Sequence, residues 1–187
     1  MKKLIIMLAD GFEEIEALTV VDVLRRADFE CHMVALGELE VRGSHDIVVK
    51  ADKSITEGNF FDYDGIILPG GMPGSKNLRE DIKVIELVKE FYASGKLVAA
   101  ICAAPIVLEK AGIVSGRSVT SYPSFKDELE HSLYKEDLVV RDENILTSRG
   151  PATTLAFAYE ILNYFGAEDK AENLKEGMVY NLLKEKI

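Results

Sequence analysis

Cys102 stands where an apolar run meets an expected helix, a position from which a thiol can act as a nucleophile. The run Leu97–Ile101 leads directly into Cys102, and Pro105 suits the first turn of a helix. Strand, nucleophile and helix in direct succession form a nucleophile elbow, whose tight turn requires small neighbours two residues away. Ala100 and Ala104 meet that requirement. Because amides at a helix start favour the anionic form of a sulfur, we expect a reactive thiolate at Cys102.

Carboxylates follow the first apolar run of the chain. Asp10 and Glu13 fit helix capping, and Glu14 fits the favourable interaction of an acid with a helix start. Glu16 shares a helical stripe with apolar residues such as Val20, which predicts packed, partly desolvated surroundings. A carboxyl group held there has a raised pKa and can share a proton with a nearby thiolate. Periodicity alone leaves the catalytic and the structural roles of Glu16 equally open.

A glycine-rich loop at residues 69–75 follows another apolar run and offers exposed backbone amides. The loop has no Gly-Lys-Ser/Thr ending and does not fit Gly-x-Gly-x-x-Gly, so a nucleotide-phosphate site is disfavoured. Two interpretations remain for Gly70 and Gly71. Either they form a plain turn, or the Gly71 amide pairs with the Ala103 amide as an oxyanion hole over Cys102.

Arg149 and the three histidines complete the set of candidates. Arg149 follows the apolar run at residues 145–147, so it either holds the loop beside the site or caps local carbonyls. His32, His45 and His131 fall outside the expected site loops, and none has a metal-ligand spacing to another. Surface or structural roles are therefore favoured for all three. We expect no Cys-His dyad of the hydrolytic kind, no metal centre and no bound cofactor.

The elements that must position these residues alternate between strand and helix. Apolar runs predict strands at residues 4–8, 31–36, 65–68, 97–101 and 145–147. Helical spacing predicts helices at residues 13–27, 81–93, 104–111, 152–164 and 171–184, and residues 41–55 fit an antiparallel hairpin. Strands that are apolar on both faces suit a largely parallel sheet with helices on both sides, a doubly wound α/β fold. In such a fold, ligands bind outside the carboxyl ends of the strands, where the candidate residues stand.

Composition and charge narrow the class of protein. A chain of 187 residues with 48% hydrophobic residues fits one domain over residues 1–187. The formal net charge of -10 disfavours nucleic acid and anionic membrane as partners. The first apolar run is too short for a signal peptide or a membrane span.

The chain has only two cysteines, Cys31 and Cys102, and their spacing is not that of a paired motif. This favours a reducing cytoplasm over a disulfide framework. Cys31 fits a small buried hydrophobic residue.

Four motifs in order resemble the ThiJ/PfpI superfamily, and within it the Parkinsonism-associated deglycase branch. They are LADGFEEIE at residues 8–16, LPGG at 68–71, AAICAAP at 99–105 and LTSRGP at 146–151. The resemblance covers essentially the whole chain and implies a flavodoxin-like fold, usually as a homodimer. It also implies Cys102 as the elbow thiol, Glu16 as its protonated partner, and oxyanion contacts from Gly71 and Ala103. Relatives in this branch are described as acting on methylglyoxal, glyoxal or glycation adducts, or as oxidation-sensing protective proteins.

Two departures from the wider superfamily narrow the expected function. The peptidase branch places a histidine directly after the elbow cysteine, whereas Ala103 follows Cys102 here, so proteolysis is disfavoured. Tyr122 stands where some deglycase-branch members have a histidine before a proline. A phenol can donate a hydrogen bond there but is a poor base at neutral pH. Glutamine amidotransferases need a His-x-Glu element, which the sequence lacks.

The resulting hypothesis is a cofactor-independent hydrolase or lyase that acts on small α-dicarbonyls or their adducts. The Cys102 thiolate would attack the aldehyde carbon, the Gly71 and Ala103 amides would stabilise the oxyanion, and Glu16 would move the proton. The alternative is a redox-sensing protective or chaperone-like protein whose Cys102 is oxidised to a sulfinate, with little turnover. Both hypotheses need the same two residues, so the sequence does not separate them.

Overall fold

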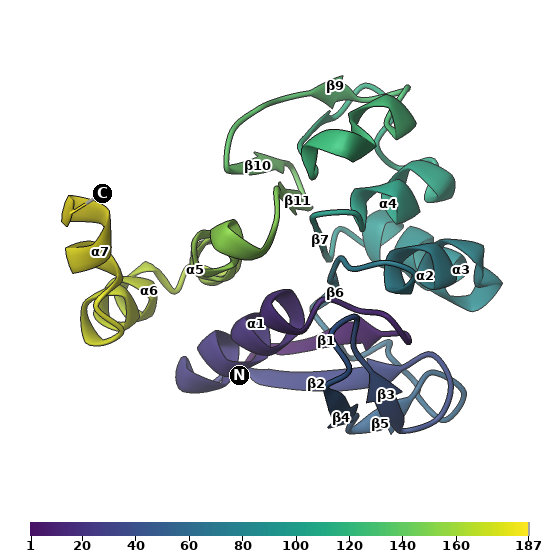
Figure 1. The fold of residues 1–187 in the computed structure, drawn as a ribbon, viewed down its shortest axis with the longest axis horizontal. Coiled ribbons are helices and arrows are strands. Elements are labelled where there is room, and N and C mark those ends of the chain that lie inside the picture. The colour runs from purple at the N-terminus through teal and green to yellow at the C-terminus, as the bar shows by residue number, and fades with distance from the viewer. Residues whose placement is uncertain (187) are drawn as a thin grey trace.

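A seven-stranded sheet forms the centre of the computed structural model, which describes residues 1–186 (Figure 1). Its strands are β1 (Lys3–Leu8), β2 (Glu30–Ala35), β5 (Lys53–Ser54), β6 (Gly65–Leu68), β7 (Leu97–Ile101), β10 (Val139–Asp142) and β11 (Ile145–Ser148). Their order across the sheet is β10-β11-β7-β6-β1-β2-β5. Every neighbouring pair is parallel except β10 and β11. The expected doubly wound, largely parallel sheet is confirmed, with an antiparallel edge strand that the apolar pattern had not predicted.

Helices cover both faces of this sheet. They are α1 (Glu14–Arg26), α2 (Gly74–Glu80), α3 (Ile82–Ala93), α4 (Pro105–Ala111), α5 (Thr154–Tyr164), α6 (Glu168–Gly177) and α7 (Tyr180–Lys186), with 3-10 helices η1 (Pro123–Glu128) and η2 (Pro151–Thr153). Helices α1 and α5 lie on one side, α3 and α4 on the other, and α6 and α7 extend beyond α5 (Figure 1). The single helix expected at residues 171–184 is wrong. Two helices replace it because Val179, with φ 55°, adopts a left-handed conformation that ends the helical path.

Alternate side chains of β1 enter two separate apolar clusters. Leu4, Ile6 and Leu8 pack with α1 and α5, whereas Ile5 and Met7 pack with residues of α3 and α4. All five are fully buried. Burial on both faces explains why this strand is apolar at every position rather than at every second one. None of the helices in the described chain has the length and apolar character needed to cross a bilayer.

Two small sheets lie outside the main one. The antiparallel hairpin expected at residues 41–55 is confirmed for β3 (Glu40–Arg42) and β4 (Val48–Lys50), whereas residues 53–54 join the main sheet as β5. The other small sheet pairs β8 (Ser118–Val119) with β9 (Leu133–Tyr134). The β3–β4 hairpin docks on the loop after β1, where the Gly11 amide donates to the Arg42 carbonyl at 2.8 Å. Asp10 Oδ1 accepts from the Arg42 amide at 2.9 Å. Its expected role as a helix cap is therefore wrong, because its carboxylate holds the hairpin instead.

The direction of strand order reverses between β1 and β6. From β1 the chain proceeds outward to β2 and β5, then returns to β6 on the opposite side and proceeds to β7 and β11. At such a switch point the loops after adjacent strands diverge and leave a crevice at the carboxyl ends. The segments after β1, β6 and β7 therefore meet at this edge.

Candidate active site

Cys102 occupies a strained elbow between β7 and α4. Its φ is 63°, a left-handed conformation that a residue with a side chain rarely adopts and that commonly marks a functional position. Two backbone hydrogen bonds hold it there. The Cys102 amide donates to the Ser148 carbonyl at 3.0 Å, and the Tyr122 amide donates to the Cys102 carbonyl at 2.8 Å. The residue remains partly exposed, in contrast to the buried Cys31.

Glu16 is fully buried in the first turn of α1 and is directed at the same point. Its Oε2 accepts a 2.7 Å hydrogen bond from the Gly70 amide. Its Oε1 is buried and has no partner at hydrogen-bond distance among the described residues. The Cys102 thiol nevertheless interacts with this carboxyl group strongly enough to lower the Glu16 pKa. The Glu16 carboxyl group is thus close enough to the thiol to exchange a proton with it.

The glycines after β6 allow these two side chains to approach each other. A Cβ on Gly70 would lie 2.6 Å from both the Cys102 Cβ and Glu16 Oε2. Gly71 has a φ of 89°, and a Cβ there would lie 2.3 Å from the Glu13 amide nitrogen. No side chain fits at either position without moving the backbone or the reactive groups.

Burial raises the pKa values of both members of the pair. Desolvation raises the pKa of Glu16 to about 7, against the hydrogen bonds that lower it. Desolvation, and then the charge of Glu16, raise the pKa of the Cys102 thiol to about 12. The amides that were expected to favour an anionic sulfur do lower its pKa, but burial and the charge of Glu16 outweigh them. In such a coupled pair, a thiolate forms when Glu16 holds the proton that the two groups share.

Two backbone amides are directed at the sulfur. Hydrogen bonds from the Ala103 and Gly71 amides lower the pKa of Cys102, opposing the effect of burial. These are the amides that the sequence suggests as an oxyanion hole. Their position is suited to negative charge on the sulfur or on an oxygen bonded to its substrate carbon.

Arg149 and Tyr122 stand at the margin of this site. The Arg149 Nη1 donates to the Glu136 carbonyl at 2.7 Å, so Arg149 caps a local carbonyl, one of the two roles expected for it. Tyr122 is half exposed, and its Cδ2 would lie 3.3 Å from a Cβ placed on Gly150. The hydrogen bond from the Tyr122 amide to the Cys102 carbonyl is its direct contact with the elbow.

His45 lies closer to the site than its place in the sequence indicates. The β3–β4 hairpin turn brings its Nδ1 to 2.9 Å from Glu14 Oε2. The His45 amide also donates to Glu14 Oε1 at 2.7 Å. No sequence spacing signals this contact, because 31 residues separate the two partners. Glu14 is therefore more than a favourable charge at a helix start.

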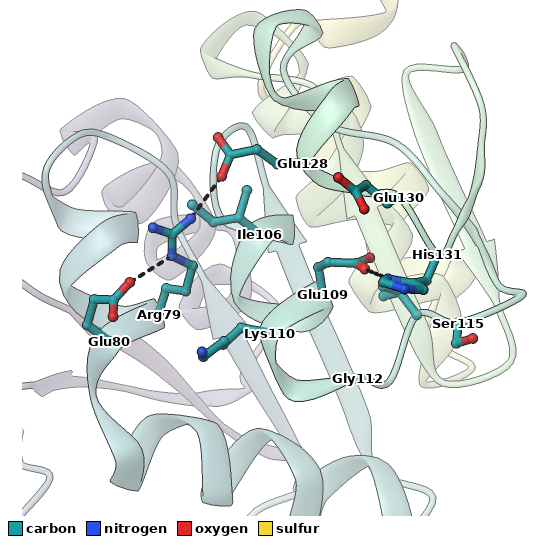
Figure 2. A pocket seen from close by; sticks show the side chains of 11 residues that line it. Arg79, Glu80, Ile106, Glu109, Lys110, Gly112, Ser115, Glu128, Glu130 and His131 are labelled. Carbon is teal, nitrogen blue, oxygen red and sulfur yellow. Dashed lines mark hydrogen bonds and ion pairs between the residues drawn. The ribbon is translucent and has the colours of Figure 1, made fainter.

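A pocket of 640 Å³ lies away from Cys102, between α2, α4 and the segment after η1 (Figure 2). Arg79 forms salt bridges with both Glu80 and Glu128 there, and His131 pairs with Glu109. Because neither Cys102 nor Glu16 lines it, this pocket is separate from the elbow site.

Known proteins match this chain over most of its length. The model of the DJ-1/PfpI family matches residues 2–164. Protein dj-1beta of Drosophila melanogaster is 38% identical over 181 residues, covering 95% of this chain and 97% of that protein. The glutathione-independent glyoxalase DJ-1 of Schizosaccharomyces pombe is 33% identical over 181 residues, covering 91% and 94% respectively. The crystal structure of Drosophila melanogaster DJ-1beta has a TM-score of 0.92 at 39% identity, covering 96% of this chain and 98% of that chain. Since sequence and structure agree over nearly the whole chain, this protein belongs to the DJ-1/PfpI family.

Proposed function

We propose that this protein converts small α-dicarbonyls such as methylglyoxal, or glycation adducts derived from them, through Cys102 and without a bound cofactor. The observation that carries the proposal is a buried Glu16 carboxyl, with a pKa of about 7, beside a cysteine held at positive φ. The Schizosaccharomyces pombe relative is named as a glutathione-independent glyoxalase. A thiol of the protein can take the place of the glutathione thiol in such a reaction, and Cys102 is the partly exposed cysteine of this chain.

The first step forms a bond between the Cys102 sulfur and the aldehyde carbon. Glu16 holds the proton that leaves the thiol and gives it to the oxygen of the hemithioacetal. The amides of Gly71 and Ala103 stabilise the negative charge on that oxygen before the proton arrives.

The second step is an internal redox rearrangement. A proton leaves the former aldehyde carbon and one returns to the neighbouring carbon, so the hemithioacetal becomes a thioester while the adjacent ketone becomes an alcohol. Glu16, with its pKa near neutrality, is suited to carry that proton in both directions. Water then cleaves the thioester, which releases lactate and restores the thiol. No external oxidant or reductant is consumed.

Oxidation sensing is a second candidate function that the same geometry favours. In a sulfinate, oxygens on the Cys102 sulfur would face the Gly71 and Ala103 amides, and a protonated Glu16 would donate to them. A sensor would use this stabilisation of the oxidised sulfur and show little turnover.

Lactate production from methylglyoxal separates the two candidates. We expect wild type and Cys31→Ala to form lactate at rates within a few-fold of each other, because Cys31 is buried in β2 and away from the elbow. Cys102→Ser should form none above the uncatalysed rate. Equal losses in both variants, with circular dichroism showing intact folds, would remove Cys102 from the mechanism. Absence of lactate in wild type would leave oxidation sensing as the function.

We also propose that the protein acts as a cytoplasmic homodimer. The side of α1 next to Glu16 exposes Ile15 at 55%, beside an open pocket of 540 Å³ that Leu155 and Met178 also line. A second chain would remove this apolar surface from water. Sedimentation velocity should give a dimer for wild type and a monomer for Ile15→Glu.

The proposed cytoplasmic location is supported by the two cysteines. Both are free thiols, the state in which a reducing compartment keeps cysteines.

A further inference from the structure

Glu13, Glu14 and His45 bring three potential ligand atoms together beside the active-site loop. One carboxylate oxygen from each glutamate and one imidazole nitrogen all lie within 4.8 Å of one another. His45 Nδ1 is 2.9 Å from Glu14 Oε2 and 3.7 Å from Glu13 Oε2. We propose that this cluster, the Glu13–Glu14–His45 site, binds a first-row divalent transition-metal ion such as Zn²⁺.

The cluster places two carboxylates next to a single imidazole. The side chains of Glu13 and Glu14 are only 12% and 5% exposed, so solvent screens their repulsion poorly. His45 is 69% exposed and contributes at most one positive charge. Arg42, in the same hairpin, is paired with Asp46. A dication placed between the three ligand atoms would neutralise both carboxylates at once.

The donor set selects the class of metal. Two carboxylate oxygens and one imidazole nitrogen suit Zn²⁺ and its first-row neighbours, whereas Ca²⁺ and Mg²⁺ prefer shells made of oxygen. Bonds of about 2.0–2.2 Å to a tetrahedral ion would place neighbouring ligands about 3.3–3.6 Å apart. The distances of His45 Nδ1 to the two carboxylates lie on either side of that value. Ser44 Oγ lies 3.3 Å from the Oε2 atoms of both glutamates and 3.0 Å from His45 Nδ1, so its single proton can hold one of these three atoms in place.

The ligand atoms are held by a rigid junction rather than by a free loop. The Ser44 amide donates to the Phe12 carbonyl at 2.8 Å, which fixes the hairpin turn against the start of α1. At Gly43, a Cβ would lie 2.2 Å from Glu14 Oε1, so the turn approaches the carboxylate as closely as backbone allows. The His45 amide occupies Oε1 at 2.7 Å and leaves Oε2 for the ion. Such preorganisation reduces the cost of assembling the ligands on binding.

Metal titration of the full chain, with any affinity tag removed, tests the proposal independently of the carbonyl chemistry. The experiment uses a Cys102→Ser background, since a thiolate is itself a metal ligand. Isothermal titration with Zn²⁺, repeated by visible absorption with Co²⁺, should show one ion per chain. Loss of an outer partner already weakens binding by about 10- to 100-fold. Substituting a direct ligand, in His45→Arg or Glu13→Gln, should weaken it by at least that factor.

Two controls keep this test decisive. His45→Arg retains a cation opposite Glu14, and its unfolding temperature without metal should match that of the parent. His131→Arg changes an exposed histidine that is likewise paired with a glutamate, Glu109, and it should leave the titration unaltered. Undiminished affinity in His45→Arg, or no saturable Zn²⁺ binding in the parent, would overturn the assignment.

Discussion

Gly70 and Cys102 are packed so closely that a Cβ on Gly70 would lie 2.6 Å from the Cβ of Cys102. The same added atom would lie 3.1 Å from the Ala103 amide nitrogen. Gly70 also donates its amide hydrogen to Glu16. One residue without a side chain therefore joins the loop after β6 to the elbow and to the buried carboxyl group of α1.

Gly70→Ala should disrupt this junction. Overpacking of this kind costs about 1–3 kcal/mol in the free energy of unfolding. A displacement of about 1 Å between reacting groups can cost about 10²-fold in rate. We expect both losses, measured by urea unfolding and by kcat/KM for methylglyoxal. The matched control is Gly37→Ala, where an added Cβ has no neighbour within 4 Å. A Gly70→Ala protein as active as the control would show that the close packing is dispensable.

The pH dependence of turnover should report the shared proton. In wild type, kcat/KM should rise with pH and level off above an apparent pKa of about 7, as the first proton leaves the Glu16–Cys102 pair. In Glu16→Gln the thiol must lose its proton to water, and burial raises its pKa. The rising limb should therefore move to higher pH, with a loss of about 10²-fold at pH 7. An identical profile in both proteins would exclude Glu16 from proton transfer.

Stability should also respond to the Glu16 pKa, with a definite sign. The folded-state pKa of about 7 exceeds the ordinary value of 4.5, so the folded protein binds this proton more tightly than the unfolded chain. The free energy of unfolding therefore falls as pH rises from 4.5 to about 7, by at most about 3 kcal/mol from this group.

Glu16→Gln isolates that contribution, since its amide oxygen can still accept from Gly70 but does not ionise. Relative to wild type, the variant should gain stability between pH 5 and pH 8. Urea unfolding at both values measures the difference. If the difference in unfolding free energy between the two proteins were the same at pH 5 and pH 8, it would contradict the raised pKa of Glu16.

Mild peroxide should modify Cys102 before Cys31. Burial raises the pKa of both thiols to about 12, so exposure and proton acceptance decide the order. Cys31 is 2% exposed, whereas Cys102 is partly exposed and lies beside Glu16, which can take its proton. Peptide mass spectrometry over a time course measures the order. Sulfinate appearing first at Cys31 would contradict a proton-sharing pair at the elbow.

The sequence alone determined the features that depend on residues adjacent along the chain. Both faces of β1 are buried, and its uninterrupted apolar run indicated this. The elbow at Cys102 was readable because strand, small residues and Pro105 follow one another directly. Local patterns predicted element boundaries less well where the backbone conformation of a single residue ends an element. The positive φ of Val179 divides the last expected helix, and nothing in its apolar spacing signals that break.

Only the tertiary structure decided which residues meet and what charge they carry. Glu16 and Gly70 are 54 residues apart, and the reversal of strand order at β1 and β6 brings them together. His45 reaches Glu14 through a hairpin whose docking no local pattern encodes. The raised pKa of Cys102 has the same origin, because desolvation depends on every segment packed around the sulfur. Spacing along a chain specifies local geometry, whereas burial and electrostatic fields arise from segments that only folding brings into contact.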